Sequence, residues 1–197
     1  MTLEGDHVRL EPLALEHHPA LCEVGLDPEL WRWSVTDVRS PEDLRRYLES
    51  ALRDQREGRS LPFATIERAG GRVVGSTRFG NIEPAHRRVE IGWTWIGRTW
   101  QRTAFNTEAK YLMLRHAFET WGCIRVELKT NALNLPSRAA ILRLGATEEG
   151  TLRRHMISER GVPRDTVYFS ILATEWPEVK ARLEQRLARG GPPPGAR

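Results

Sequence analysis

Cysteine is scarce in this chain, and its scarcity argues against a disulfide framework and against a cysteine metal site. The two cysteines, Cys22 and Cys123, are far apart in the sequence and fit no metal-ligand spacing, so we expect two reduced thiols. The six histidines form no HExxH pattern, and we expect no metal cofactor.

Long apolar runs and two nucleotide-binding signatures are also missing. No stretch approaches the ~18 apolar residues of a membrane-spanning helix, so we expect no membrane partner. Residues 1–6 lack the basic and apolar regions of a signal peptide, which favours a cytoplasmic protein. No GxGxxG follows the first predicted strand, which argues against a dinucleotide-dependent oxidoreductase, and the lack of GK[ST] excludes a Walker loop.

Lysine is rare, so the basic residues are nearly all arginine. The net charge is +4, and the arginines are interspersed with acids, as where Arg45 and Arg46 follow Glu42 and Asp43. This pattern is typical of solvated faces crossed by ion pairs rather than of a stripe that binds nucleic acid. We therefore expect no nucleic-acid partner. The pI of about 9.5 leaves a ribosome-associated role as an alternative, which the salt dependence of binding would test.

What is present is an ordinary globular composition. Hydrophobic residues make up 40% of the 197 residues and charged residues 28%, which suits one folded domain with a substantial core. We expect this domain to span residues 1–189, with its core at 8–176 and a terminal helix at 174–189. The sequence of residues 190–197, GPPPGAR preceded by glycine, predicts a disordered tail.

Strand and helix patterns alternate along the chain. Alternating or β-branched runs predict strands at residues 7–13, 62–67, 73–79, 87–96, 124–130, 147–157 and 164–173. Helical periodicity and end signals predict helices at 15–26, 41–58, 105–121, 134–144 and 174–188. The order predicts an α+β fold, an α/β three-layer arrangement whose mixed, mostly antiparallel sheet of about seven strands is flanked by helices. The three strands between 62 and 96 should form an antiparallel meander.

Residues 100–109 are the most informative stretch. A strand pattern at Val89–Ile96 leads through a short polar loop into the helix pattern at 105–121. A strand, a tight loop and a helix start in succession bring several main-chain N–H groups and the positive end of the helix dipole to one point. Such a point binds phosphate.

Two motifs in this order resemble a known family. The sequence VEIGWTWI at 89–96, followed by QRTAFN at 101–106, resembles the acetyl-CoA motif of the GNAT N-acetyltransferase superfamily. The sequence NLPS at 134–137, followed by LRLGA at 142–146, resembles the second motif of its RimJ/RimL branch. The resemblance spans most of the chain and implies a GNAT-like acyl-CoA N-acyltransferase fold. It further implies acetyl transfer from acetyl-CoA to a primary amine in a ternary complex, and a homodimer is common in this branch.

The resemblance places acetyl-CoA along the strand, the loop and the helix starts. The cofactor-binding residues that it implies are Trp93, Thr94, Trp95, Ile96, Gln101, Arg102, Thr103, Ala104, Phe105, Asn106, Thr107, Asn134 and Ser137. The loop is poor in glycine: Ala104, Asn106 and Arg102 stand where relatives often have glycine or another small residue. Fewer glycines leave fewer positions free for positive φ or close approach to a phosphate, and a charged contact from Arg102 can compensate. An ordinary strand-to-helix loop is the alternative.

Attack on a thioester needs a neutral amine, so a base must remove a proton. The resemblance makes Glu90 the candidate base. The alternatives are a surface glutamate paired with Arg87 or Arg88, and removal of the proton through ordered water without a single essential base. Ser137 would lie near the cofactor sulfur. Ile141 stands where many relatives carry a tyrosine that acts as general acid, so Ser137 or solvent would have to donate the proton. Asn134 would bind pantetheine or cap its helix.

The acceptor-binding residues implied are Trp31, Trp33, Arg154 and Tyr168, with packing as the alternative for the aromatic ones. Arginines at this rim would suit an acceptor that carries a carboxylate, and the amine would belong to a protein N-terminus, ribosomal or other, or to a small molecule. The competing function is a non-catalytic acyl-CoA-binding regulatory or sensor domain, which the glycine-poor loop and the missing tyrosine would explain.

Overall fold

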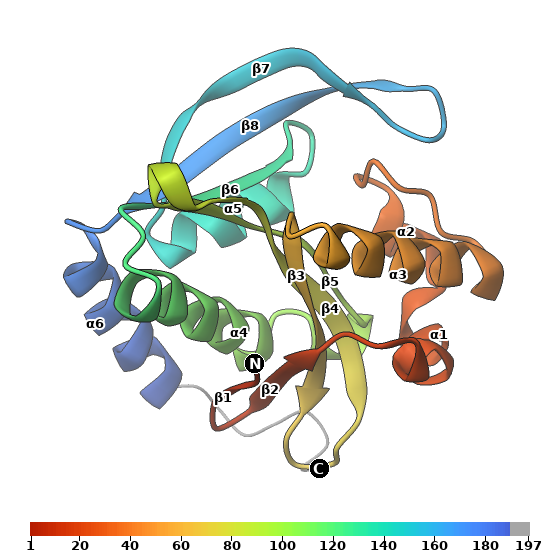
Figure 1. The fold of residues 1–197 in the computed structure, drawn as a ribbon, viewed down its shortest axis with the longest axis horizontal. Coiled ribbons are helices and arrows are strands. Elements are labelled where there is room, and N and C mark those ends of the chain that lie inside the picture. The colour runs from red at the N-terminus through yellow and green to blue at the C-terminus, as the bar shows by residue number, and fades with distance from the viewer. Residues whose placement is uncertain (190–197) are drawn as a thin grey trace.

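The computed structural model describes residues 1–189; the tail predicted at 190–197 lies outside the described residues. Eight strands form a single sheet in the order β1-β2-β3-β4-β5-β6-β8-β7 (Figure 1). The strands are β1 (Leu3–Glu4), β2 (Val8–Pro12), β3 (Ser60–Glu67), β4 (Val73–Glu83), β5 (Arg88–Ile96), β6 (Arg125–Asn131), β7 (Thr147–Ile157) and β8 (Pro163–Leu172). The helices are α1 (His18–Gly25), α2 (Pro28–Trp31), α3 (Pro41–Arg56), α4 (Ala104–Arg115), α5 (Leu135–Leu144) and α6 (Trp176–Ala188).

The sheet confirms the predicted fold class. Its neighbouring strands are antiparallel except for β5 and β6, which run parallel, and β3, β4 and β5 form the predicted meander. The strand number was underestimated, because β1 has two residues and is too short to show an alternating pattern. The single helix predicted at 105–121 is α-helical as far as Arg115 and then continues as a π-helical turn, His116–Thr120.

Local sequence signals explain where the helices begin and end. The Ser40 hydroxyl accepts a hydrogen bond from the Asp43 N–H, and Pro41 occupies the first position of α3, as its cap pattern predicts. Asp27 caps α2 through the Glu29 N–H. Gly145 ends α5 at φ 100°, a left-handed conformation that costs glycine little.

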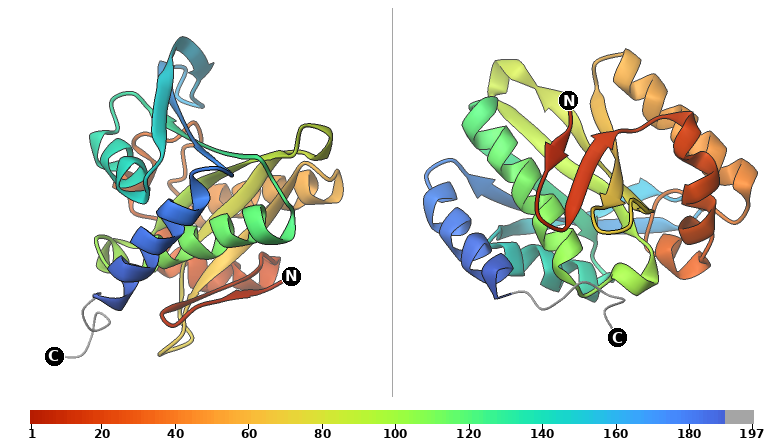
Figure 2. Two further views of the ribbon diagram at one scale, coloured as in Figure 1. Left: turned by 90° about the vertical axis from the view of Figure 1, so that its left-hand side faces the viewer. Right: turned by 90° about the horizontal axis from the view of Figure 1, so that it is seen from below.

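Two hydrophobic clusters cover the two faces of the sheet. Helices α4, α5 and α6 pack on one face around Phe79, Val126 and Phe169. Helices α1, α2 and α3 pack on the other face around Trp31 and Trp95. Figure 2 shows α4 and α6 lying side by side, while the β7–β8 hairpin projects beyond the helices. None of the helices within residues 1–189 combines the length and apolar character needed to cross a membrane.

Strands β5 and β6 pair only at their beginnings. The parallel register runs from Arg88 opposite Arg125 to Glu90 opposite Glu127, and β5 then continues to Ile96 without a partner on that side. The β4–β5 register also shifts here, so that Trp93 bulges out of the ladder at φ 49°. The sheet is therefore open along the second half of β5.

The Trp93 ring lies directly over β4. A Cβ atom at Gly80 would come within 2.2 Å of this ring, so only glycine leaves room for it. The Trp93 carbonyl accepts a hydrogen bond of 3.3 Å from the Tyr47 hydroxyl on α3. The bulge is thus fixed by the packing of the Trp93 ring on β4 and by the hydrogen bond from Tyr47 of α3.

Candidate active site

The start of α4 faces the open part of β5 with free hydrogen-bond donors. The loop after β5 contains a 3-10 turn, Arg98–Trp100, in which the N–H groups of Trp100 and Gln101 are already paired. Among residues 1–189, no hydrogen-bond partner engages the N–H groups of Arg102, Thr103, Ala104 and Asn106. Four free amides at a helix start, with the positive end of its dipole, form an anion-binding site.

The predicted loop residues divide between those that shape this site and those that face it. Thr103 caps α4: its hydroxyl accepts from the Phe105 N–H and donates to the Trp100 carbonyl. Gln101 donates from its side-chain amide to the Ile96 carbonyl at 3.0 Å, which bridges the loop back to β5. Phe105 is buried in the core, so only its main chain is available to a ligand.

Arg102 adopts the left-handed conformation, at φ 62°, that the family's glycine would take freely. The loop therefore has its turn without glycine, at a conformational cost of about 1 kcal/mol for a residue with a Cβ. The Arg102 side chain is exposed beside the free amides, where its charge can meet a phosphate.

The N-terminus of α5 brings the second motif to the same opening. The Asn134 side-chain oxygen accepts from the Ser137 N–H at 3.1 Å, so this residue caps α5, as one of the two predicted roles requires. Its amide nitrogen has no partner within the described part of the chain and can still bind a ligand. Ile141, at the position of the missing tyrosine, is buried in the core and supplies no proton.

Glu90 is buried, with 2% of its surface exposed, and it lies on the face of the sheet opposite α4. Its Oε2 atom accepts from the Asn81 amide at 2.7 Å and pairs with the Lys129 ammonium at 2.8 Å. The alternative partners are engaged elsewhere. Arg87 donates to the Gly122 carbonyl, and Arg88 pairs with Glu83 and Glu127. The idea of a surface glutamate paired with Arg87 or Arg88 was therefore wrong.

Around Glu90 the structure assembles a cluster that sequence reasoning missed. The Lys129 ammonium lies 5.7 Å from the Trp93 ring centroid and 5.8 Å from that of Tyr168. The Arg78 guanidinium, 3% exposed, lies 5.6 Å from the centroid of the same Trp93 ring. Of this cluster, Lys129 and Arg78 were not predicted, whereas Tyr168 was. Register could have found Lys129, which is paired with Tyr168 between β6 and β8, but only if the strand order had been known.

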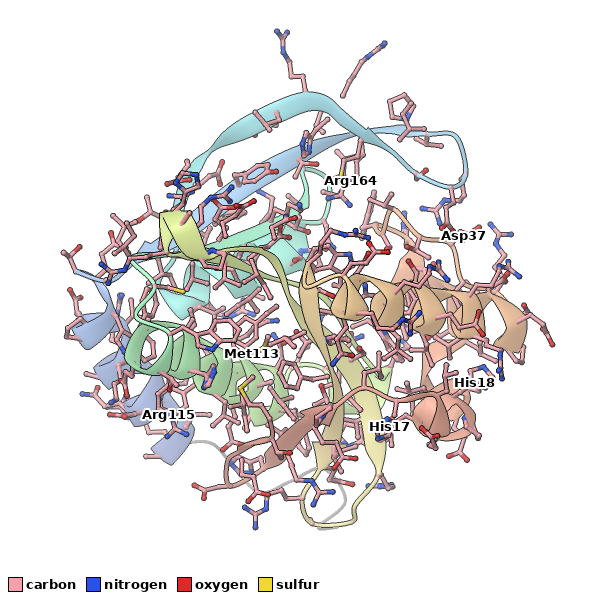
Figure 3. All side chains as sticks on the ribbon, viewed as in Figure 1. His17, His18, Asp37, Met113, Arg115 and Arg164 are labelled. Atoms are coloured by element: carbon pink, nitrogen blue, oxygen red, sulfur yellow. The ribbon has the colours of Figure 1, made fainter. Side chains whose placement is uncertain are left out.

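Arg164 closes this cluster from the β7–β8 hairpin. It lies between the hairpin and α3 (Figure 3) and donates to the Trp33 carbonyl at 3.3 Å. Burial lowers the pKa of Arg164, while the charge of Glu90 and the nearby Tyr168 oppose that effect. Of the predicted acceptor residues, Trp33 and Tyr168 thus adjoin the Glu90 cluster.

Two predicted acceptor residues lie elsewhere. Trp31 is buried, 2% exposed, and packs against Tyr47 and Trp95, so its ring offers no surface to an acceptor and that prediction was wrong. Arg154 lies on an exposed bulge of β7 at φ 48°. It borders an open depression of about 550 Å³, also lined by Thr151, Leu152, Arg153 and Asp165. This depression is separate from the Glu90 cluster.

The geometry fits a long phosphorylated cosubstrate whose reactive end reaches the middle of the sheet. The free amides at α4 would hold its phosphates, and the unpaired edge of β5 can pair with an extended amide chain as an added strand. When bound, acetyl-CoA supplies a thioester as the electrophile. Within residues 1–189 there is no group of three or more metal-binding side chains.

An open strand edge beside a helix start with free amides can accommodate an acyl-CoA, as in acyl-CoA-dependent transferases. The acetyltransferase (GNAT) domain profile matches residues 7–147. The chain therefore belongs to the GNAT acetyltransferase family and is an acetyl-CoA-dependent N-acetyltransferase.

Relatives and solved structures agree with this assignment. The uncharacterised N-acetyltransferase p20 of Bacillus licheniformis is 27% identical over 179 residues, which cover 89% of this chain and 98% of that protein. A GCN5-related N-acetyltransferase from Brucella melitensis superposes with a TM-score of 0.87 at 32% identity, covering 95% of this chain and 85% of that one. Mycobacterium smegmatis RimJ, solved with CoA-disulfide, gives 0.78 at 27% identity over 93% and 90% of the two chains.

Proposed function

We propose that this enzyme transfers the acetyl group of acetyl-CoA directly to a primary amine within a ternary complex. One observation carries the proposal: within residues 1–189, four main-chain N–H groups at the start of α4 have no hydrogen-bond partner, and β5, which leads into this helix, pairs with β6 only as far as Glu90. The diphosphate would bind the amides, and the pantetheine arm would follow residues 93–96. A free N–H of this strand would then stabilise the oxyanion that forms on attack.

Glu90 is the proposed base, and its surroundings define how it would work. The Asn81 amide and the Lys129 ammonium both engage Oε2. Oε1 is the oxygen that remains for a proton, either from the amine itself or through one water. Ser137, at the start of α5, is the proposed proton donor to the departing sulfur, because Ile141 cannot serve.

The acceptor is proposed to carry a carboxylate as well as its amine. Lys129, Arg164 and Arg78 carry three positive charges against two carboxylates, Glu90 and the Asp54 that lies 3.9 Å from Arg78, so the cluster has more positive than negative charge. An acidic acceptor would compensate that excess. Trp33 and Tyr168 would line its path, and Arg154 would contact it only where it extends beyond the cluster.

Two relatives support placement in the RimJ/RimL-like branch and a protein N-terminus as one acceptor class. YdaF of Bacillus subtilis (strain 168), 32% identical over 87% of this chain and 94% of that protein, has a name that provisionally describes a ribosomal N-acetyltransferase. The RimJ structure from Mycobacterium smegmatis adds a similar fold with a CoA derivative. A cytoplasmic location and a homodimer are part of the same proposal.

A thiol-release assay tests the proposal. The protein would be mixed with acetyl-CoA and two matched acceptor sets: short peptides with acidic or basic second residues, and small amines with or without a carboxylate. We expect turnover, and faster turnover with the acidic member of each pair. Binding of CoA by calorimetry without turnover on any acceptor would instead support the sensor alternative. No heat of binding at all would overturn the cofactor site.

A further inference from the structure

Lys110 is a buried lysine with no acid beside it. It lies on α4 with 5% of its surface exposed, and its ammonium donates to the hydroxyl groups of Thr77 on β4, at 3.0 Å, and Thr94 on β5. The two hydroxyl oxygens are themselves 2.8 Å apart. Thr94 belongs to the open half of β5, and its surface is exposed. The ammonium is therefore one hydroxyl group away from the strand edge that is proposed to receive acetyl-CoA.

The acids on the elements around Lys110 are committed to other partners. On α4 itself, Glu108 accepts from the main-chain N–H groups of residues 6–8. Glu67 on β3 pairs with Arg72, and Glu184 on α6 accepts from the Tyr111 hydroxyl. Glu90 on β5 points to the opposite face of the sheet. Strands β1 and β2 turn only apolar side chains, Leu3, Val8 and Leu10, into this cluster. Burial therefore acts unopposed, and it lowers the pKa of Lys110 to about 7.

A lysine in this position is costly if it serves packing alone. Met113 lies one turn further along the same helix, fully buried, and shows that an unbranched apolar side chain fits this layer. A buried ammonium with two hydroxyl partners and no carboxylate destabilises the fold relative to such a residue. The charge is placed against Thr94, beside the register shift between β4 and β5 at Trp93.

We propose that Lys110 is a positioning residue for the thioester, acting through the Thr94 hydroxyl to fix the open half of β5 and to place a positive charge behind the point of acyl transfer. This inference rests on the proposed function, because it uses β5 as the acetyl-CoA strand. The charge favours the negative oxygen that forms when the amine attacks the thioester carbonyl. It acts only while the lysine is protonated.

The first test measures proton uptake on acetyl-CoA binding, without turnover. The thioester carbonyl dipole should raise the proton affinity of Lys110. Calorimetry at pH 7.5 in buffers of different ionisation enthalpy should then show the wild-type protein taking up about half a proton more than Lys110→Met, if the pKa rises by about one unit. Lys180→Met is the matched control, since Lys180 pairs with Glu119 on the surface of α6, and it should behave as wild type.

The second test measures kcat of the wild type and of Lys110→Met at each pH and takes their ratio. Ionisation of the acceptor amine affects both enzymes equally, so it cancels in this ratio. Because kcat reports the enzyme–substrate complex, where the first test expects the pKa to be about one unit higher, the ratio of wild type to Lys110→Met should be about tenfold or more below about pH 8 and should shrink above it. KM for acetyl-CoA should change less than threefold. Lys110→Arg remains charged, so its ratio to Lys110→Met should stay constant with pH. Thr94→Val should lose as much as Lys110→Met, and the double variant should lose no more than either single one.

The outcomes separate this inference from the proposed function. Wild-type protein that binds acetyl-CoA with the same proton uptake as Lys110→Met would overturn the role of Lys110 alone, as would a ratio of kcat values that is independent of pH. Wild-type protein that shows no binding heat would overturn the acetyl-CoA site and this inference together. If Lys110→Arg is unfolded by circular dichroism, the methionine variant decides alone.

Discussion

The two sides of β5 offer a ligand different chemical groups. On the α4 side the site consists of main-chain N–H groups, held in place by a helix start and a 3-10 turn. On the opposite side it consists of charged and aromatic side chains around Glu90, contributed by β4, β5, β6 and β8. A main-chain site tolerates substitution of its side chains as long as the backbone path survives. A side-chain site changes its ligand with each substitution.

This difference suits the two substrates of an acetyltransferase. The phosphates of acetyl-CoA are the same in every relative, so a site made of amides serves them all. The acceptor differs from one enzyme to another, and the Lys129, Arg164 and Tyr168 side chains offer a surface that can vary. Lys110 is the exception on the α4 side, because it brings a charged side chain to a region otherwise made of backbone.

The largest effect should come from the side-chain half. Glu90→Gln should lower kcat by about 10² to 10⁴ near neutral pH if Glu90 is the base, with partial recovery at high pH where the amine is already neutral. The matched control is Glu127→Gln, on the next strand and in register with Glu90. A pH–rate profile that Glu90→Gln leaves unchanged would remove Glu90 as the base.

The next effect concerns stability and Lys110. Burial lowers the pKa of Lys110 from its ordinary 10.5 to about 7, so the folded state resists protonation of this group. The native state should lose stability as pH falls from about 10.5 to 7, by up to about 5 kcal/mol at about 1.4 kcal/mol per pH unit. Urea unfolding of Lys110→Met against wild type should show this difference below pH 7 and its decline above. A difference that does not change with pH would mean that the pKa of Lys110 is the same in the folded and unfolded states, and it would contradict the lowered pKa.

A substitution at the helix start should have an intermediate effect. Ala104→Val places a branched side chain next to one of the free amides, and it should raise KM for acetyl-CoA about tenfold, or about 1.4 kcal/mol, by crowding the diphosphate. Ala181→Val, on an exposed position of α6, is the control and should leave KM unchanged. Equal KM values for both variants would move the phosphate site elsewhere.

Arg102 separates backbone from charge in the same loop. Arg102→Gly should stabilise the fold by up to about 1 kcal/mol, because glycine takes φ 62° without a Cβ penalty. It should weaken CoA binding only a few-fold, through the lost charge. Arg102→Ala keeps the strained conformation and loses the charge, so thermal unfolding and calorimetry on both variants distinguish the two contributions. A loss of binding above a hundredfold would mean that the site depends on the side chain.

The smallest effect concerns the ion pair of Arg125 and Glu149. Hydrogen bonds from Arg125 lower the pKa of Glu149 to about 2. Stability from this pair should be complete above pH 4.5 and should be lost as pH falls towards 2. Because the pair is partly exposed, screening holds its contribution to about 1 kcal/mol or less. The free energy of unfolding of Glu149→Gln should be lower than that of the wild type above about pH 4.5, and the two values should converge as the pH falls towards 2.

The sequence predicts where α4 starts after β5 more directly than it predicts which side chains meet on the opposite side of the strand, for a physical reason. Element order alone specifies a helix start after a strand, so residues 101–106 could be assigned before any contact was known. The Glu90 cluster depends on which strands are neighbours and in what register, and nothing local reports that β8 lies between β6 and β7. Trp31 was misread because a tryptophan in a loop and one in a core have the same sequence signature.

The fold class was predictable because hydrophobic periodicity is strong in the long elements, whereas β1 and α2 carry too few residues for a period. Lys110 was not singled out, because a lysine within a helix predicts a solvated face. The signal that could have found it is its position among the apolar residues Ala109, Tyr111, Leu112 and Met113, in the part of α4 where every residue from 108 to 114 is buried.

Glu108 links the N-terminal residues 6–8 to α4, whose start is proposed to bind the phosphates of CoA. Its carboxylate binds the three main-chain N–H groups of residues 6–8, and a Cβ at Gly5 would come within 2.4 Å of it. Residues 6–8 therefore help to fix the position of α4 through Glu108. Removing residues 1–8, or fusing a tag directly to them, should displace α4. The free amides at the start of α4 lie one helical turn before Glu108 and should move with it. We therefore expect weaker affinity for CoA from a change that touches no substrate.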